Sequence, residues 1–154
     1  ILFDLNDFKN LNDHHGHPIG DASLTHFSRL VHQQLRESDI FARYGGDEFV
    51  LFLPETDLDG TLTVLENLWD LLQGTRYMVE GSIVHLQTSA GVSCASSANT
   101  YDYDELIYQA DRSLYASKEI EKCSAAFWED HRVVCYHITS DHQLRHCPSE
   151  TSAS

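Results

Sequence analysis

Two short apolar runs separated by a pair of glycines are the feature that most constrains the fold of this chain. Residues 40–44 and 49–53 each have the length of a strand, and a Gly-Gly-Asp-Glu sequence at residues 45–48 joins them. Glycine adopts the positive φ angles that tight turns require, so the pattern predicts a β-hairpin. The hairpin places two acidic residues at its turn.

Hydrophobic periodicity predicts the other elements. In chain order we expect a strand over residues 1–5, a polar turn with short helical character over 6–13, a helix over 18–36, the hairpin, a helix over 57–74, strands over 76–79 and 83–95, a helix over 102–122 and a last strand over 125–128. This mixture predicts an α+β fold, with a mixed, mainly antiparallel sheet flanked by helices. From residue 129 onward the periodicity is lost, so we expect one domain over residues 1–128 and an irregular or disordered tail over 129–154.

The charge of the chain excludes several classes of partner. It has 24 acidic and 10 basic residues, which gives a formal net charge of −14. Proteins that bind duplex nucleic acid or anionic membranes through a broad surface neutralise phosphates with cations, so no nucleic-acid partner is expected. No run approaches the roughly 18 consecutive apolar residues of a membrane-spanning helix. The four cysteines are scattered, so we expect a cytoplasmic domain with reduced thiols.

Three carboxylates indicate where chemistry takes place. Asp4 lies at the end of the first predicted strand, and Asp47 and Glu48 lie in the hairpin turn. If the two strands are neighbours, these side chains converge, and a hard divalent cation makes their repulsion tolerable. Such a cation also binds phosphate oxygens, so the pattern indicates a nucleotide-phosphate site. Taken one at a time, the same acids are more typical of ordinary turn residues.

Four segments carry a resemblance to a known family. They are residues 4–13, 17–21, 43–49 and 110–118, with the sequences DLNDFKNLND, HPIGD, RYGGDEF and ADRSLYASK. In content, order and spacing they resemble the GGDEF family of diguanylate cyclases over about residues 1–123. The resemblance implies a palm-like nucleotidyl cyclase fold with a ferredoxin-like βαββαβ core. It also implies condensation of two GTP into cyclic di-GMP and two pyrophosphates, by metal-assisted attack of a ribose 3′-hydroxyl on an α-phosphate, in a homodimer.

The resemblance assigns roles to the acidic residues. It implies that Asp4, the carbonyl of Leu5 and Asp47 hold Mg²⁺ or Mn²⁺. Glu48 becomes the general base or a second metal contact beside the attacking hydroxyl, which is a poor nucleophile at neutral pH. The division of roles between Asp47 and Glu48 stays open.

The resemblance also implies a set of substrate-binding residues. They are Asn12 and Asp21 for guanine, His17 in the same stretch, and Phe8, Lys9, Lys118 and Lys122 for the triphosphate. A carboxylate accepts hydrogen bonds from the N1–H and amino group of guanine, whereas adenine presents a lone pair at N1, so GTP is favoured over ATP. His17 is equally explained as a packing residue at a helix start, and Lys118 and Lys122 as solvated cations at a helix end. Glu121 stands where the family usually has a glycine, which weakens the case for Lys122.

A second motif, Arg36-x-x-Asp39, precedes the hairpin turn. It resembles the inhibitory site at which family members bind their product, cyclic di-GMP. A guanidinium grips phosphate or the Hoogsteen edge of guanine through two hydrogen bonds, and an aspartate accepts from guanine. The alternative is a helix-terminal arginine followed by a strand-entry aspartate. Residues 57–73 hold no Arg or Lys that would complete the site, so we expect weak product inhibition or dependence on a partner domain.

Three functions are therefore open. The intact Gly-Gly-Asp-Glu-Phe turn favours a cyclase; a non-catalytic cyclic di-GMP receptor that binds through Arg36 and Asp39, and a GTP-binding regulatory module, are the alternatives. Family members carry a helix before the first strand, so we expect this domain to be truncated at its N-terminus and any sensory or membrane domain to lie upstream. The Cys and His residues of the tail lack the spacing of zinc ligands, so no structural metal is expected there.

Overall fold

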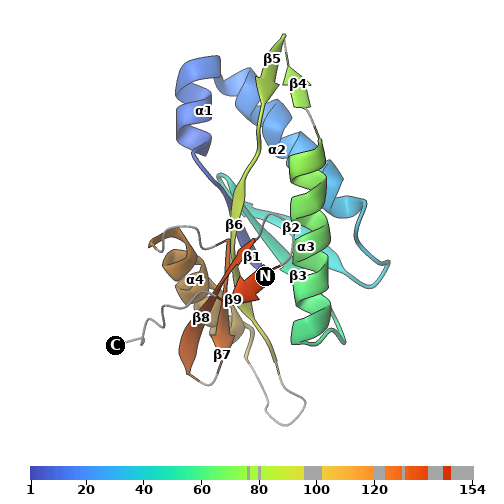
Figure 1. The fold of residues 1–154 in the computed structure, drawn as a ribbon, viewed down its shortest axis with the longest axis vertical. Coiled ribbons are helices and arrows are strands. Elements are labelled where there is room, and N and C mark those ends of the chain that lie inside the picture. Colours follow the sequence, from blue (N-terminus) through green and yellow to red (C-terminus); the bar gives the residue numbers. More distant parts are fainter. Residues whose placement is uncertain are drawn as a thin grey trace.

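The computed structural model describes residues 1–75, 77–79, 81–95, 102–119, 124–129, 131–138 and 144–146. In chain order the elements are β1 (Leu2–Leu5), α1 (Phe8–His15), α2 (His17–His32), β2 (Ile40–Gly45), β3 (Glu48–Phe52), α3 (Leu58–Gly74), β4 (Tyr77–Val79), β5 (Ser82–Val84), β6 (Thr88–Ser93), α4 (Tyr103–Glu119), β7 (Ala125–Glu129), β8 (Arg132–Ile138) and β9 (Leu144–His146). In Figure 1, α3 and α4 lie on opposite sides of the strands. No helix in these ranges has the length and hydropathy needed to cross a membrane.

Seven strands form one sheet in the order β2-β3-β1-β6-β7-β8-β9. Neighbouring strands run antiparallel, except that β6 and β7 are parallel. Strands β4 and β5 pair separately as a two-stranded hairpin, which projects beside α2 at the top of Figure 1. The predicted α+β fold with a mixed, mainly antiparallel sheet is confirmed.

The side chains of β1 alternate between the two faces of the sheet. Phe3 is buried in the main core, which also contains Phe27 of α2 and apolar residues of α3. Leu2 lies in a smaller cluster on the other face, with Ala110 of α4. Asp4 is two residues after Leu2, so its side chain points to the face that α4 covers.

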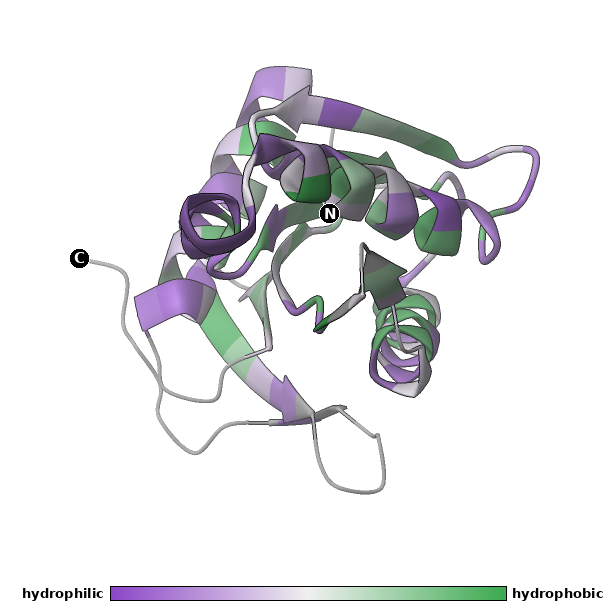
Figure 2. Cartoon of the chain, turned by 90° about the horizontal axis from the view of Figure 1, so that it is seen from above, coloured by the Kyte–Doolittle hydropathy of each residue, from purple (hydrophilic) through white to green (hydrophobic). Residues whose placement is uncertain are grey.

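The helices that cover the sheet are amphipathic. α3 begins after Asp57, whose side chain accepts a hydrogen bond of 2.9 Å from the backbone nitrogen of Gly60. It buries an apolar stripe that includes Leu65, Leu68 and Leu72. Figure 2 shows the corresponding pattern, with hydrophobic and hydrophilic bands alternating along the helices.

α4 approaches the sheet closely because β6 has a glycine at position 91. A Cβ atom on Gly91 would collide with the backbone oxygen of Ala110 and the backbone nitrogen of Leu114. The helix backbone therefore lies directly against β6 at this point. Lys118 follows Leu114 by one helical turn, so this contact also fixes where the lysine is presented.

Three predicted boundaries differ from the structure. The polar segment 6–13 forms most of the helix α1, which continues to His15, and the helix expected over 18–36 ends at His32. The strand expected over 83–95 is two strands, because β5 pairs with β4 in the hairpin whereas β6 pairs with β1 in the main sheet.

The expectation of an irregular tail is wrong for β8 and β9. β8 pairs antiparallel with β7 and with β9 at the edge of the sheet. Val133, Val134 and Cys135 are buried in succession, so the alternation by which a half-buried strand is recognised is absent. Residues 139–143 and 147–154 lie outside the described residues.

Candidate active site

Two of the predicted carboxylates face each other across neighbouring strands. β1 pairs antiparallel with β3, and the register places Asp4 opposite Glu48. Opposed residues of an antiparallel pair project to the same face of the sheet, with Cβ atoms about 4.5–5.5 Å apart. Two sequence motifs that are far apart along the chain therefore bring their acids together on the face covered by α4.

Lys118, near the C-terminal end of α4, reaches this pair. Its Nζ atom lies 2.8 Å from Oδ2 of Asp4, and the side chains are 40% and 15% exposed, respectively. The ion pair joins α4 to the end of β1. One of the predicted phosphate-binding cations thus contacts one of the predicted metal ligands.

Negative charge accumulates around Glu48. Burial and, next, the carboxylate of Asp4 raise the pKa of Glu48 above its ordinary value, and Asp47 and Asp111 act in the same direction. Lys118 acts in the opposite direction. The site therefore has more negative charge than the lysine alone neutralises.

The hairpin turn holds Asp47 beside the end of β1. Its backbone oxygen accepts a hydrogen bond of 3.3 Å from the backbone nitrogen of Leu5, and the Nε of Arg43 donates to the backbone oxygen of Gly46 at 2.8 Å. Gly46 has a φ of 52°, as expected for the predicted turn. Glu48, rather than Asp47, is the turn acid in register with Asp4.

The connection from β1 to α1 is also tightly organised. Asp7 has a φ of 55°, a left-handed conformation that is uncommon outside glycine, and its side chain accepts from the amide of Asn10 at 3.2 Å. Phe8 packs against the core and Lys9 is exposed. Residues 7–9 therefore present the start of α1 next to the end of β1.

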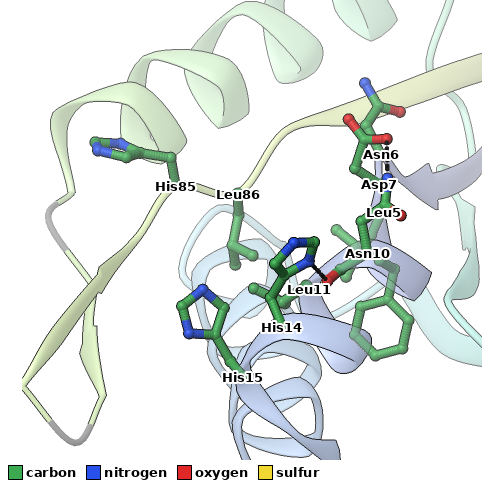
Figure 3. Close-up of a pocket in the computed structure, with 10 residues that line it drawn as sticks. Leu5, Asn6, Asp7, Asn10, Leu11, His14, His15, His85 and Leu86 are labelled. Carbon is green, nitrogen blue, oxygen red and sulfur yellow. Dashed lines mark hydrogen bonds between the residues drawn. The ribbon is translucent and has the colours of Figure 1, made fainter.

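A cavity of about 250 Å³ lies between α1 and the segment that joins β5 to β6. Figure 3 shows it with His14 and His15 on α1 and His85 on the joining segment; the Nδ1 of His14 is 2.8 Å from the backbone oxygen of Asn10. Phe8, Leu11 and His15 of α1 also line the cavity, whereas Asn12 does not.

Asn12 packs against α2 beside Asp21. A Cβ atom on Gly20 would collide with the Oδ1 atom of Asn12. That oxygen is buried and has no hydrogen-bond partner within the described residues. Asp21 and His17, both on α2, are exposed. The structure thus places Asn12 near Asp21, with one side chain packed inward and the other open to solvent.

The Arg36-x-x-Asp39 motif forms a turn at the other end of β2 from the acidic site. The Oδ2 atom of Asp39 accepts from the backbone nitrogen of Arg36 at 2.8 Å, and the backbone nitrogen of Asp39 donates to the oxygen of Arg36 at 3.1 Å. The side chain of Arg36 is exposed. The aspartate therefore closes a turn that follows α2, which ends at His32, and the role of the motif in binding cyclic di-GMP stays a prediction.

Lys122, which the sequence assigns to the triphosphate, lies outside the described residues, as does Glu121. Apart from Arg36 and Asp39, the other predicted site residues form two groups, one at the end of β1 and one on the two helices that follow it. Asp4, Leu5, Asp47, Glu48 and Lys118 surround the end of β1, and Phe8, Lys9, Asn12, His17 and Asp21 lie on α1 and α2.

Comparisons with known proteins agree with this arrangement. A family model described as "Diguanylate cyclase, GGDEF domain" matches residues 1–123. The chain is 35% identical over 118 residues to the probable diguanylate cyclase DgcE of Escherichia coli K12, a match that covers 77% of this chain and 11% of that protein. It is 31% identical over 124 residues to diguanylate cyclase A of Treponema denticola, with 77% and 32% covered.

Solved structures give the same result. Diguanylate cyclase SiaD of Pseudomonas aeruginosa, in complex with its activator SiaC, matches with a TM-score of 0.70 and 33% identity over 77% of this chain and 45% of that one. The GGDEF domain of TpbB (YfiN) from the same organism matches with a TM-score of 0.68 and 32% identity over 77% of this chain and 73% of that one. The chain belongs to the GGDEF family.

This GGDEF domain spans about a tenth of DgcE and about a third of the Treponema relative. The two groups of residues described above lie within the part of the chain that the family model matches.

The carboxylates of the GGDEF domain fit a hard divalent cation. Mg²⁺ typically takes one or two protein carboxylates and fills its other positions with phosphate oxygens and water. Asp4 and Glu48 supply two opposed carboxylates. Burial first, and then the charge of Asp4, raise the pKa of Glu48, and a bound cation would neutralise that charge. No group of three or more His, Cys, Asp or Glu side chains arranged to hold a metal ion occurs in the described part of the chain.

Asp111 is a site residue to which the sequence analysis gave no role. It lies on α4 and contributes to the field at Glu48. Asp111 and Lys118 are seven residues apart, so they share one side of the helix. That spacing is the signal in the sequence that would have identified it.

Proposed function

We propose that this domain is a diguanylate cyclase, which condenses two GTP molecules into cyclic di-GMP and releases two pyrophosphates. The observation that carries the proposal is the register of β1 and β3, which places Asp4 opposite Glu48 with Lys118 in contact. These groups lie at the start of α1, where backbone N–H groups favour phosphate. Membership of a family with named diguanylate cyclases supports the same reaction.

In this proposal Glu48 accepts the proton of the attacking ribose 3′-hydroxyl. The pKa of Glu48 is raised and therefore lies closer to the working pH than that of an ordinary glutamate. A general base is most effective when its pKa lies near that pH. A bound Mg²⁺ or Mn²⁺ would lower the barrier by neutralising charge on the α-phosphate. Asp4 and the carbonyl of Leu5 would hold that ion, with Asp47 beside them and Glu48 opposite.

The residues of α1 and α2 would bind the nucleotide. Asp21 would accept from the N1–H and amino group of guanine, Asn12 would turn from Gly20 to contact the base, and His17 lies at the same end of α2. Phe8, Lys9, Lys118 and Lys122 would meet the triphosphate. Because two GTP molecules react with each other, catalysis requires two domains to face one another, at least as a transient homodimer.

The receptor alternative has weaker structural support. One carboxylate oxygen of Asp39 already accepts a hydrogen bond from the backbone of Arg36, which leaves the exposed guanidinium and the remaining acceptor sites of Asp39 for cyclic di-GMP. We propose that this motif is at most a weak product site. Binding of cyclic di-GMP that is lost in Arg36→Ala, in a protein without turnover, would select the receptor instead.

The cyclase is tested by incubating the purified domain with GTP and Mg²⁺ or Mn²⁺ and measuring cyclic di-GMP by chromatography. We expect product, a rate per chain that rises with protein concentration, and a loss of at least about 100-fold in Glu48→Gln, the scale of general base catalysis. Glu55→Gln is the matched control, because Glu55 is exposed and lies beyond the far end of β3. GTP binding without product at any protein concentration would contradict the cyclase and select a GTP-binding regulatory module.

A further inference from the structure

Lys118 occupies the place where a cation is expected. Its ammonium lies 2.8 Å from Oδ2 of Asp4, the carboxylate that also fits a divalent cation. Among the charged groups that act on Glu48, three are carboxylates and Lys118 is the cation. In the structure described here, the lysine therefore supplies the positive charge of the site.

The ammonium and a divalent cation repel each other when both lie at one carboxylate. The ammonium contacts Oδ2 of Asp4 at 2.8 Å, so a cation bound to either oxygen of Asp4 would lie close to it. The Asp4 side chain is only 15% exposed, which limits screening of this repulsion by water. A cation at Asp4 should therefore bind more tightly once Lys118 has moved away.

The Lys118 side chain can change its conformation, and a bound triphosphate would offer its ammonium another partner. Its side chain is 40% exposed and has four rotatable methylene groups, whereas the backbone of α4 is fixed against Gly91. The ammonium can swing while the helix stays in place. A triphosphate bound at the start of α1 would offer it oxygen acceptors of higher charge than Asp4 alone.

We propose that Lys118 makes the binding of a divalent cation conditional on the nucleotide. Without nucleotide, the ammonium holds Asp4 and a free cation must overcome its repulsion or displace it into water. With nucleotide, the displaced ammonium pairs with phosphate, and phosphate oxygens complete the coordination that the protein ligands leave open. This inference rests on the metal site proposed above at Asp4 and the carbonyl of Leu5, and it gives Lys118 the role of coupling the two ligands.

The coupling is measured with Mn²⁺ as the probe, by electron paramagnetic resonance of the free ion, with and without the α,β-methylene analogue of GTP. That analogue cannot be cleaved at the reacting bond, so turnover does not enter the measurement. We expect Lys118→Met to bind Mn²⁺ alone about 5- to 50-fold more tightly than the wild type, within the usual range of coupling between sites. The effect of the nucleotide on Mn²⁺ affinity should shrink by a similar factor, because Lys118 has already left Asp4 in the nucleotide complex and its removal changes Mn²⁺ affinity little there.

Two further variants separate competition from other effects. Lys118→Arg keeps a cation that pairs with Asp4, so Mn²⁺ alone should bind as weakly as in the wild type. Arg112→Met removes one positive charge from the exposed surface of the same helix, away from Asp4, and should change Mn²⁺ affinity less than twofold. If Lys118→Met does not fold by circular dichroism, Lys118→Gln removes the charge, keeps a hydrogen-bond donor and carries the same expectation.

Each outcome bears on the inference. Mn²⁺ affinity without nucleotide that is unchanged or weaker in the folded Lys118 variant overturns it, as does an absence of Mn²⁺ binding in both proteins. Tighter binding and reduced coupling support it. A protein that shows this coupling and yet makes no cyclic di-GMP would contradict the proposed cyclase and leave the role of Lys118 standing.

Discussion

Helices α1 and α4 each pack against a glycine near the candidate site, but the two glycines contact different kinds of atoms. Gly91 lies against the backbone of α4, at the oxygen of Ala110 and the nitrogen of Leu114. Gly20 of α2 lies against the end of a side chain of α1, the amide of Asn12. Backbone within a helix does not yield to an added methyl group, whereas a side-chain amide adopts another rotamer.

This difference matches what each helix presents. α4 carries Lys118, whose ion pair with Asp4 depends on a fixed distance between helix and strand. α1 carries Asn12, whose buried oxygen has no partner within the described residues. A polar atom left without a hydrogen bond favours rearrangement toward a ligand that supplies one. The α4 side is therefore the rigid side of the site, and the α1 and α2 side is the adaptable one.

The largest expected effect is a loss of stability on the rigid side. Gly91→Val places side-chain atoms in the backbone of α4, and we expect a decrease of about 3 kcal/mol in the free energy of unfolding, the upper end of typical overpacking costs. Urea unfolding followed by circular dichroism measures it. Gly74→Ala is the control, because a Cβ atom there meets nothing within 4 Å. A loss below about 1 kcal/mol would show that α4 is not rigidly held.

The corresponding change on the adaptable side should alter binding more than stability. In Gly20→Ala the new Cβ atom displaces the amide of Asn12, while alanine in a helix is favoured over glycine by about 1 kcal/mol. The net stability change should be small. Because Asn12 turns from Gly20 to contact the base, this displacement should raise the preference for GTP over ATP, measured as a ratio of dissociation constants. Asn12→Ala removes the contact and should lower the preference about tenfold, the equivalent of one hydrogen bond; an equal fall in Gly20→Ala would contradict this role of Asn12.

Lowering the pH should destabilise the packing of α2 on the adaptable side. His26 of α2 is buried and stacks on Tyr77 of β4 at 3.9 Å between ring centroids, and Arg29 donates to its Nδ1 at 3.1 Å. Burial, and then Arg29, lower the pKa of His26 below its ordinary value of 6.5. The neutral ring is thus favoured in the folded state, and this contribution to stability is lost as the pH falls below 6.5.

The matched variant is His26→Phe, which keeps an aromatic ring against Tyr77 and does not titrate. Between pH 7 and pH 5, thermal unfolding of the wild type should shift downward relative to this variant by a few degrees at most. The other histidines titrate in both proteins, so the difference isolates His26. Parallel curves for the two proteins would show that the stack does not respond to protonation.

Local patterns in the sequence predicted some of these features and missed others, for identifiable reasons. Asp4 and Glu48 follow from strand ends and a turn, and the structure confirms that their strands are neighbours. The burial of Asn12 depends on how α1 meets α2 at Gly20, which no local pattern reports. The strand that contains Val133, Val134 and Cys135 was missed because three consecutive buried residues have no alternation. The Arg36-x-x-Asp39 sequence is compatible with a product-binding motif and also with a turn in which the Asp39 side chain accepts a hydrogen bond from the backbone of Arg36. The sequence alone therefore did not predict the turn.

The smallest expected effect concerns Glu48 on the rigid side, and its sign is opposite to that of His26. Burial and Asp4 raise the pKa of Glu48 above its ordinary value of 4.5. The folded state therefore favours the protonated acid, and the ionised form at neutral pH costs stability that is recovered as the pH falls toward 4.5.

Glu48→Gln should raise Tm at pH 7 in metal-free buffer. The corresponding gain in the free energy of unfolding should be no more than the roughly 1 kcal/mol typical of partly exposed charges. The gain should vanish near pH 4.5, where the wild type is itself protonated, and shrink with Mg²⁺, which supplies the missing positive charge. Thermal unfolding at the two pH values, with Glu55→Gln as the control, measures it; a variant less stable than the wild type at pH 7 would mean that the ionised carboxylate stabilises the fold.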